Sequence, residues 1–570
     1  MRQVEVEAPP ERIPAGPPHQ LLLEHGHGWP EPTPELRGWA WLMERLGLNA
    51  AELVIMGTLL LVAFVLRFFS PLMPDGNSPL LITNCVQNTP VNAQNQTGTL
   101  CGLSYPFQRN YAQVGQPATP PNGQVFDEIY FAVFAHDDLK GISYIDPEPP
   151  LSKLIIASGE WLYGGFRAIF QGAQGNWADL GFNTFGWRIM SCIFGSLCLP
   201  MMYLFARQLW PNRIFAIAAA TLVGFDGMFF IQSRIGMIDI FPIFLIMLSY
   251  TLFLVHLGSR SERESIVTLL LTGIACGLAI AAKWIALAAT ASIIFFLVAR
   301  PLMRWVGLTV GEGERAWRWG LNRERSILPG GARAGLYVGT AALAFIAFPL
   351  VIYVASWFPF FLRGQFHSLG DLVRYNQWAY TYHATLTATH PYGSTWYSWP
   401  FLNRPVAYYY EATGLGVDTS SGSPLVAGMV DLGNPIIWWA SIPAVLALPY
   451  FVLRHRSFPA AVILVGFITQ YLPWARITRV IFLYHMFGGL IFMILALAFV
   501  LTRMQMAGPV EIHVFGDRMT LSTRFLVPGF LALAVLSFAF FYPVWTGLPL
   551  SDQAYLTGFP HGKMWLPSWI

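Results

Sequence analysis

Long apolar runs recur along the whole sequence, and they constrain its fold more than any other feature. A helix needs about 20 mostly apolar residues to cross the hydrocarbon core of a bilayer. About eleven runs meet or approach that length. They extend approximately from Ala51 to Phe69, Trp187 to Leu209, Ile214 to Ile231, Ile235 to Leu257, Ile266 to Ala282, Trp284 to Leu302, Leu336 to Phe361, Asn434 to Leu453, Ala460 to Trp474, Val480 to Leu501 and Phe525 to Pro543. The short gaps near Arg234 and Lys283 could each hold a re-entrant turn, so ten spans are an alternative. We therefore expect an all-α integral membrane protein.

The composition agrees with a chain whose solvent is largely lipid. Hydrophobic residues make up 55% of the sequence and charged residues only 11%, whereas an average soluble domain has roughly 25% charged residues. The net charge is +3 and no long basic run is present, which argues against a nucleic-acid-binding surface.

The basic residues of the short connections predict the orientation. If residues 1–50 form a polar cytoplasmic segment, every cytoplasmic connection is basic, as the positive-inside rule requires. These connections contain Arg207 and Arg213, Arg260 and Arg263, the stretch from Arg300 to Arg333, Arg454 and Arg456, and Arg503, Arg518 and Arg524. Residues 1–50 have no early apolar core, so we do not expect a signal peptide. The transmembrane domain is expected at 51–545, with long outer segments at 70–186 and 362–433 and an outer tail at 546–570.

Two of the five cysteines lie in the first outer segment. Cys85 and Cys101 occur in a polar stretch with neither a nearby His nor the spacing of a metal site, so we predict a disulfide between them. Such a bond requires an oxidising compartment, which is the compartment that the orientation assigns. The other three cysteines lie inside apolar runs and are expected to be core residues.

Charged residues at membrane depth are costly, so they are candidates for function. In the predicted topology, those at the ends of spans all face the outer side; they are Asp127, Glu128, Asp146, Glu148, Lys153, Arg234, Asp239, Lys283, Arg476 and Arg479, with Tyr484 and His485 beside them. An acidic pair in an apolar setting can supply a general base. Arg and Lys can hold a phosphate and stabilise the charge that grows on it as it leaves. This set predicts an enzyme that displaces a lipid phosphate.

Each of these residues also has a structural interpretation. Asp127 and Glu128 could simply begin a helix, where acidic residues are favourable. Arg234 and Asp239 could pair with each other, Lys283 could extend to the interface, and His485 could be a hydrogen-bonded packing residue. The set as a whole supports function more strongly than any single member.

Several of these residues form motifs that resemble the protein O-mannosyltransferase family in its own order. The motifs are Phe126-Asp127-Glu128, Pro149-Pro150-Leu151-Ser152-Lys153, Ser233-Arg234-Ile235 with Asp239, Lys283-Trp284, Trp396-Tyr397-Ser398-Trp399-Pro400 with Arg404-Pro405, Gly433-Asn434-Pro435, and Tyr471-Leu472-Pro473-Trp474 with Arg479 and Tyr484-His485. The resemblance covers most of the chain and implies a GT-C bundle that uses a polyprenyl-phosphate mannose donor.

The resemblance also implies roles for individual residues. Asp127 would be the catalytic base and Glu128 would orient its neighbours. Arg234 would contact the donor phosphate or the acidic pair. Donor binding would fall to Lys153, Lys283, Arg479 and His485, supported by Asp239, Tyr484 and Glu148. Mannose would pass with inversion to Ser or Thr hydroxyls of secreted or membrane proteins. No cofactor besides the lipid-linked donor is implied, and the need for a divalent metal and the oligomeric state stay open.

Three departures from the family pattern affect this interpretation. Glu148 stands where the family usually has His before Pro-Pro-Leu. The stretch before Asp127 is about 50 residues longer than in the family. The segment 362–433 is too short to contain a β-trefoil domain beside its own motif, which indicates a prokaryotic-type member in the cell membrane with its site on the outer side.

Two other functions compete with this one. A related GT-C enzyme that glycosylates a lipid or glycan, such as an aminoarabinose transferase, usually has Lys before Pro-Pro-Leu, whereas Lys153 follows it here. A transporter would also explain charges within many spans, but its charges should lie along a path through both leaflets.

Overall fold

The computed structural model describes residues 43, 46, 48–68, 85–90, 97–101, 125–259, 261–305, 332–412, 417–418, 421–455, 457–514, 517–559 and 561–569. The predicted cytoplasmic segment 1–50 lies almost entirely outside these residues.

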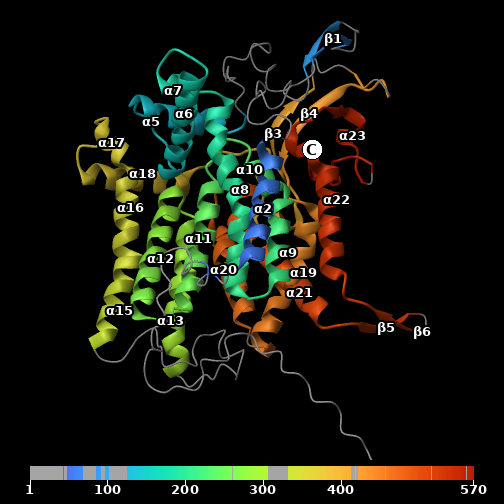
Figure 1. Ribbon diagram of the computed structural model, residues 1–570. Coiled ribbons are helices and arrows are strands. Elements are labelled where there is room, and N and C mark those ends of the chain that lie inside the picture. The colour runs from blue at the N-terminus through green and yellow to red at the C-terminus, as the bar shows by residue number, and fades with distance from the viewer. Residues whose placement is uncertain are drawn as a thin grey trace, which may run out of the picture.

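A bundle of apolar helices forms the body of the molecule (Figure 1). In the described part of the chain, nine helices are long and apolar enough to cross a membrane. They are α2 (Ala50–Phe68), α8 (Thr184–Leu209), α11 (Ile240–Leu257), α12 (Glu262–Ala282), the continuous α15, η2 and α16 (Ala332–Ala342, Leu343–Ala347 and Phe348–Ser356), α19 (Pro435–His455), α20 with η4 (Phe458–Tyr471 and Leu472–Arg476), η5 with α21 (Leu483–Met486 and Phe487–Met506) and α22 (Leu526–Thr546). All nine coincide with predicted spans, so the chain is a multi-pass membrane protein.

The two remaining predicted spans also contain apolar helices. One is α13 (Ala286–Trp305), which is apolar over Ala286–Ala299. The other is α9 (Arg213–Gly224), a short helix that is followed by the separate helix α10 (Gly227–Gln232). The predicted single span from Ile214 to Ile231 is therefore divided. The division occurs at Asp226, whose carboxylate accepts hydrogen bonds from the backbone N–H groups of Phe229, at 3.1 Å, and Asn434, also at 3.1 Å. Asp226 is thus the N-cap of α10, and its carboxylate stabilises the start of a new helix after α9.

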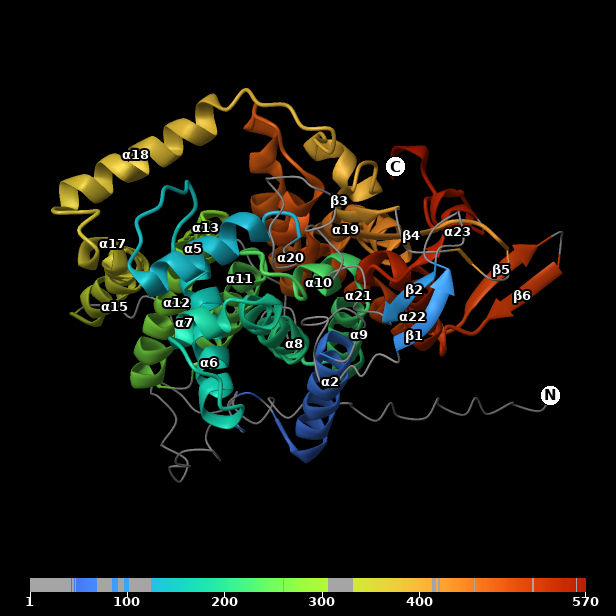
Figure 2. The ribbon, with the colours of Figure 1, turned by 90° about the horizontal axis from the view of Figure 1, so that it is seen from above.

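One end of the bundle is covered by short elements, and we call it the capped end (top of Figure 1). Most come from the two long segments predicted to be outer and from the C-terminal residues. The short helix Phe358–Leu362 instead overlaps the predicted span from Leu336 to Phe361, because the membrane-length helix ends at Ser356. The helical elements are α5 (Glu128–Lys140), α6 (Leu151–Phe170), α7 (Trp177–Gly181), α17 (Phe358–Leu362), α18 (Leu369–Thr385), η3 (Trp396–Phe401), α23 (Asp552–Leu556) and η6 (Pro567–Trp569). Seen along the bundle in Figure 2, α18 runs along the rim of the molecule.

Short antiparallel strands complete the fold. At the capped end, β3 (Val406–Glu411), β4 (Leu425–Asp431) and β7 (Leu550–Ser551) pair in that order. The hairpin of β5 (Val510–Val514) and β6 (Asp517–Leu521) lies at the other end.

The cysteines predicted to form a disulfide lie on a further pair of strands, β1 (Cys85–Pro90) and β2 (Thr97–Cys101). The pairing places Cys85 directly opposite Cys101. Their side chains lie outside the described residues, so the disulfide stays a prediction. Cys192, Cys198 and Cys276 are buried and free.

Helices α6, α7 and α8 are locked together at glycines. A Cβ atom on Gly164 would lie 1.8 Å from the carbonyl oxygen of Trp177, and one on Gly181 would lie 1.7 Å from that of Glu160. A Cβ atom on Gly186 would lie 1.9 Å from the carbonyl oxygen of Gly181. Only glycine permits backbones to approach this closely. Helices α6 and α7 are thereby packed tightly against the bundle helix α8.

The other end of the bundle contains a buried carboxylate with several partners. Glu52, at the start of α2, is fully buried and accepts a hydrogen bond from the hydroxyl of Tyr203. It also pairs with Arg207 at 3.1 Å and Arg213 at 3.0 Å. These two arginines belong to the first connection predicted to be cytoplasmic, so we call this the basic end.

Candidate active site

Asp127 lies just before α5 at the capped end, in an unusual local geometry. Phe126 has a φ of 49°, in the left-handed region, and its ring stacks on that of Tyr408 with centroids 4.4 Å apart. Asp127 follows as the residue that caps α5, but its side chain makes no capping hydrogen bond. Its carboxylate is therefore left available for other chemistry. Burial, together with the nearby charge of Asp239 and opposed by Lys283, raises the pKa of Asp127 to about 7.

Glu128, the next residue, has the opposite environment. It is fully buried, and its two oxygens accept hydrogen bonds from Nε and Nη2 of Arg188, at 2.7 and 2.6 Å. They also accept bonds from the backbone N–H groups of Gly236, at 2.6 Å, and Val125, at 2.8 Å. Glu128 thus joins α5 to α8 and to the loop before α11.

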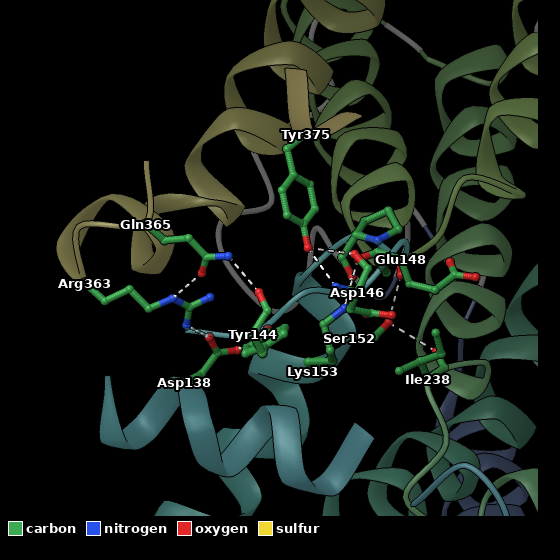
Figure 3. A network of polar contacts seen from close by, with 12 residues as sticks. Asp138, Tyr144, Asp146, Glu148, Ser152, Lys153, Ile238, Arg363, Gln365 and Tyr375 are labelled. Atoms are coloured by element: carbon green, nitrogen blue, oxygen red, sulfur yellow. Dashed lines mark hydrogen bonds and ion pairs between the residues drawn. The ribbon is translucent and has the colours of Figure 1, made fainter. Parts of the chain in front are cut away.

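The ammonium group of Lys153 also has a full set of hydrogen-bond partners (Figure 3). Its ammonium group is buried, pairs with the carboxylate of Asp146, and donates to the carbonyl oxygens of Glu148, at 2.9 Å, and Pro149, at 3.1 Å. An ammonium group has three hydrogens, and these three acceptors use them all. The adjacent Ser152 bonds to the carbonyl oxygen of Ile238 at 3.1 Å. The geometry therefore gives Lys153 a place in holding the loop from Asp146 to Pro150.

Asp239 and Lys283 form an ion pair where two bundle helices end. Asp239 precedes α11, Lys283 follows α12, and Lys283 Nζ lies 2.7 Å from Asp239 Oδ1. The other oxygen of Asp239 is buried and has no hydrogen-bond partner among the described residues. The alternative pairing of Asp239 with Arg234, weighed from the sequence, is not the one adopted.

Glu148 lies among basic groups. Burial alone would raise the pKa of Glu148, but Lys283, His383, Lys153 and Arg479 together lower it. Arg479 is half-buried, and the acceptor of its Nη1 is the carbonyl oxygen of Val480, at 3.3 Å. Glu148 therefore lies close to several basic groups, of which Lys153 and Lys283 are paired with Asp146 and Asp239.

Arg234 lies deeper in the bundle. It is buried, its Nη1 donates to the carbonyl oxygen of Trp545 at 3.3 Å, and its guanidinium carbon lies 4.8 Å from the ring centroid of Phe230. These contacts join α10 to α22.

Tyr484 and His485 lie closer to Asp127. The ring of Tyr484 is edge-on to that of Phe126, with centroids 6.3 Å apart. Nδ1 of His485 accepts a hydrogen bond from the backbone N–H of Phe482 at 3.1 Å, and its ring lies 4.5 Å from that of Trp474. These contacts agree with the interpretation of His485 as a hydrogen-bonded packing residue.

Two residues of this region were not identified from the sequence. Arg188 lies within the apolar run of α8, and the cost of a charge at membrane depth was a signal that could have marked it. His383 lies in α18, where nothing local indicates its proximity to Glu148. Among the described residues, no group of three or more His, Cys, Asp or Glu could hold a metal ion.

Two family models match consecutive parts of the chain. Residues 118–362 match the family described as dolichyl-phosphate-mannose-protein mannosyltransferase. Residues 368–569 match the C-terminal four-transmembrane region of protein O-mannosyltransferase. These two models of one family follow each other and together include the capped end and most of the bundle.

Curated relatives match over most of the chain. The polyprenol-phosphate-mannose–protein mannosyltransferase of Mycobacterium tuberculosis is 26% identical over 500 aligned positions, and the match covers 78% of this chain and 86% of the relative. The protein of the same name from Corynebacterium glutamicum is 25% identical over 515 residues, covering 79% of this chain and 89% of the relative.

A solved structure has the same fold. The Saccharomyces cerevisiae protein O-mannosyltransferase Pmt1–Pmt2 complex, bound to the sugar donor, matches with a TM-score of 0.64 at 14% identity. The match covers 93% of this chain and 94% of the yeast chain.

Proposed function

Because the chain belongs to the protein O-mannosyltransferase family, we propose that it transfers mannose from a polyprenyl-phosphate carrier to hydroxyl groups of protein acceptors, with Asp127 as the general base. The relatives named above carry this activity in their names, and they match along most of their length. The GT-C fold of this family of membrane glycosyltransferases agrees with the observed bundle.

The environment of Asp127 is the observation that carries the role of base. Its carboxylate makes no capping bond, whereas its neighbour Glu128 is held by Arg188 and two backbone groups. A general base works best when its pKa lies near the operating pH, and burial brings the pKa of Asp127 to about 7. Of these two carboxylates, Asp127 is therefore the one suited to accept a proton.

The reaction would proceed by a single displacement at the sugar. The hydroxyl oxygen of a Ser or Thr attacks C1 of mannose, and its proton passes to Asp127. The bond between C1 and the phosphate oxygen breaks with its electron pair remaining on oxygen, so polyprenyl phosphate leaves with one more negative charge. Lys283 and Arg479, which share the field around Glu148, would stabilise that charge. Attack opposite the leaving group would invert the configuration at C1.

The orientation of the bundle supports acceptors on the outer side. Asp127, Glu148 and Lys283 lie toward the capped end, and the arginines of the first predicted cytoplasmic connection lie at the basic end. With the basic end in the cytoplasm, the site would face the compartment that receives exported proteins. This arrangement supports the proposal of a plasma-membrane enzyme that acts on secreted or membrane proteins.

Transfer in isolated membranes tests the proposal. Labelled polyprenyl-phosphate mannose and a Ser/Thr-rich acceptor peptide are incubated with membranes that contain the wild type or Asp127→Asn. We expect labelled peptide with the wild type and its loss with the variant, at equal amounts of inserted protein. Label that appears in lipid and not in peptide would contradict a protein acceptor and favour the lipid-glycosylating alternative.

A further inference from the structure

Helix α18 presents one face to the rest of the protein. After the first turn, its less exposed residues are Leu372, Tyr375, Asn376, Ala379 and His383. Spacings of three and four residues place them on one side of a helix. Trp378, Tyr380 and Tyr382 are exposed and flank this face. The last residue of the inward face is thus a titratable imidazole.

Polar contacts fasten this segment to the connection between α5 and α6 (Figure 3). The hydroxyl of Tyr375 accepts a hydrogen bond from the backbone N–H of Asp146, at 2.8 Å, and donates to its carbonyl oxygen, at 3.0 Å. Gln365 donates to the carbonyl oxygen of Tyr144 at 2.7 Å. Arg363 pairs with Asp138 at 2.5 Å. The register of α18 against the loop that carries Glu148 is therefore well defined.

A second set of contacts fixes α18 relative to α12 and α16. The side-chain oxygen of Asn376 accepts a hydrogen bond from the hydroxyl of Tyr353 at 2.5 Å, and that hydroxyl accepts one from the indole N–H of Trp284 at 3.1 Å. Trp284 follows Lys283 in the sequence, and its ring lies edge-on to that of His383, with centroids 6.1 Å apart. His383 is therefore held beside the basic groups already described.

The two nitrogens of His383 differ. The backbone of Pro147 acts to raise the pKa of His383, against the larger effect of burial, which lowers it. Nδ1 is buried and has no hydrogen-bond partner among the described residues. The charged groups around the ring are Glu148 on the preceding loop, Lys283 after α12, and Arg479 before η5. A buried, unpartnered nitrogen in that position is suited to a ligand.

We propose that His383 is a further residue of the donor phosphate site, where its Nδ1 would donate a hydrogen bond to a phosphate oxygen of the carrier. This inference rests on the proposed function. Both ring nitrogens are donors in the imidazolium ion, and that charged form makes the stronger hydrogen bond to an anionic phosphate. Burial keeps the pKa of His383 below its ordinary value, opposed by Glu148. Binding of the phosphate would therefore take up one proton from solvent onto the imidazole.

Proton-linked binding provides the test. The purified full-length protein is titrated with polyprenyl phosphate near pH 7 by calorimetry in two buffers of different ionisation enthalpy. The difference between the two heats gives the protons taken up per ligand bound. His383→Gln removes the titrating group and keeps an amide. His367→Gln is the matched control, because His367 is exposed and just precedes the same helix.

We expect His383→Gln to weaken binding by about 10- to 100-fold, the usual range for a lost charge-assisted hydrogen bond, and to lower the proton uptake. His367→Gln should match the wild type in both. Unchanged affinity in His383→Gln would overturn the proposal. So would weaker binding with unchanged proton uptake, because a packing role alone would give that result.

The same preparation separates failure of this inference from failure of the proposed function. If the wild type transfers mannose to peptide but His383→Gln binds polyprenyl phosphate normally, only the role of His383 is wrong. If the wild type fails to transfer mannose yet shows histidine-dependent binding, the phosphate site stands and the assigned reaction is wrong.

Discussion

Two carboxylates at opposite ends of the bundle have opposite surroundings. Glu52 at the basic end is bonded to Tyr203 and paired with two arginines, one of them half exposed. Asp127 at the capped end makes no capping bond, and its pKa is raised to about 7 by burial and by Asp239, against Lys283. A buried charge is tolerated when it is paired. Saturated groups such as Glu52 and Glu128 therefore hold helices together, and an unsaturated group is available for chemistry.

The largest effect is expected from Asp127→Asn. This nearly isosteric change removes the base and leaves the backbone bonds at the start of α5 in place. General bases typically contribute about 10²- to 10⁴-fold to the rate, so kcat for mannosyl transfer should fall by that factor. Initial rates measured at saturating donor, normalised to inserted protein, check this. A variant that keeps most of the wild-type rate would show that the unsaturated carboxylate is not the base.

Breaking the buried ion pair of Glu128 and Arg188, next to Asp127, should lower the stability of the protein. Arg188→Met leaves the buried carboxylate of Glu128 without its partner, and breaking such a pair typically costs about 3–5 kcal/mol. Thermal unfolding in detergent should show a large loss of stability. The double variant Glu128→Gln, Arg188→Met should recover part of the loss, because no charge remains unpaired. Normal stability with lost transfer would instead give Glu128 a direct part in the reaction.

The ionisation of Asp127 should determine how the rate of transfer depends on pH. The base must be ionised to accept a proton, and the pKa of Asp127 is about 7. At saturating donor, we expect kcat/KM for the acceptor peptide to be level above that value and to fall about tenfold for each pH unit below it. In Asp127→Asn the residual rate should lose this dependence. A wild-type profile that is level down to pH 5 would exclude Asp127 as the titrating group.

The smallest functional effect is expected at the basic end. Glu52→Gln keeps the shape of the side chain but loses the ion pairs with Arg207 and Arg213, at a cost of about 1–3 kcal/mol in stability. Transfer by the protein that remains folded should match the wild type. A drop in kcat without a drop in stability would show that Glu52 contributes to catalysis. It would then be wrong to give the basic end a structural role alone.

Hydropathy predicts most of this fold because lipid exposure is a local property of a run of residues. All nine long spans occur where the apolar runs occur. The break between α9 and α10 was missed because it depends on partners of Asp226 that are distant in sequence, such as Asn434 and Trp438. The local pattern around Ile214 to Ile231 contains no trace of those partners.

The residues of the candidate site could be named from the sequence. Whether each of them is paired or hydrogen-bonded could not be predicted. The acidic pair was recognised, yet whether a carboxylate is saturated depends on a partner elsewhere. The partner of Glu128 is Arg188, which is 60 residues away on another helix. His383 was missed for the same reason, since α18 alone gives only the spacing of its inward face. Tertiary contacts between distant segments thus supply what the motifs lack.

The glycine contacts of α6, α7 and α8 have a consequence for how this enzyme can diverge. An alanine at Gly164, Gly181 or Gly186 would place its methyl carbon less than 2 Å from a carbonyl oxygen. Such a substitution requires the backbone to move, and α6 begins with the residues that hold the loop of Glu148 and Lys153. These three positions therefore have no room for a residue larger than glycine. Segments attached mainly by side chains, of which α18 is one, can accept substitutions without moving the backbone of α6.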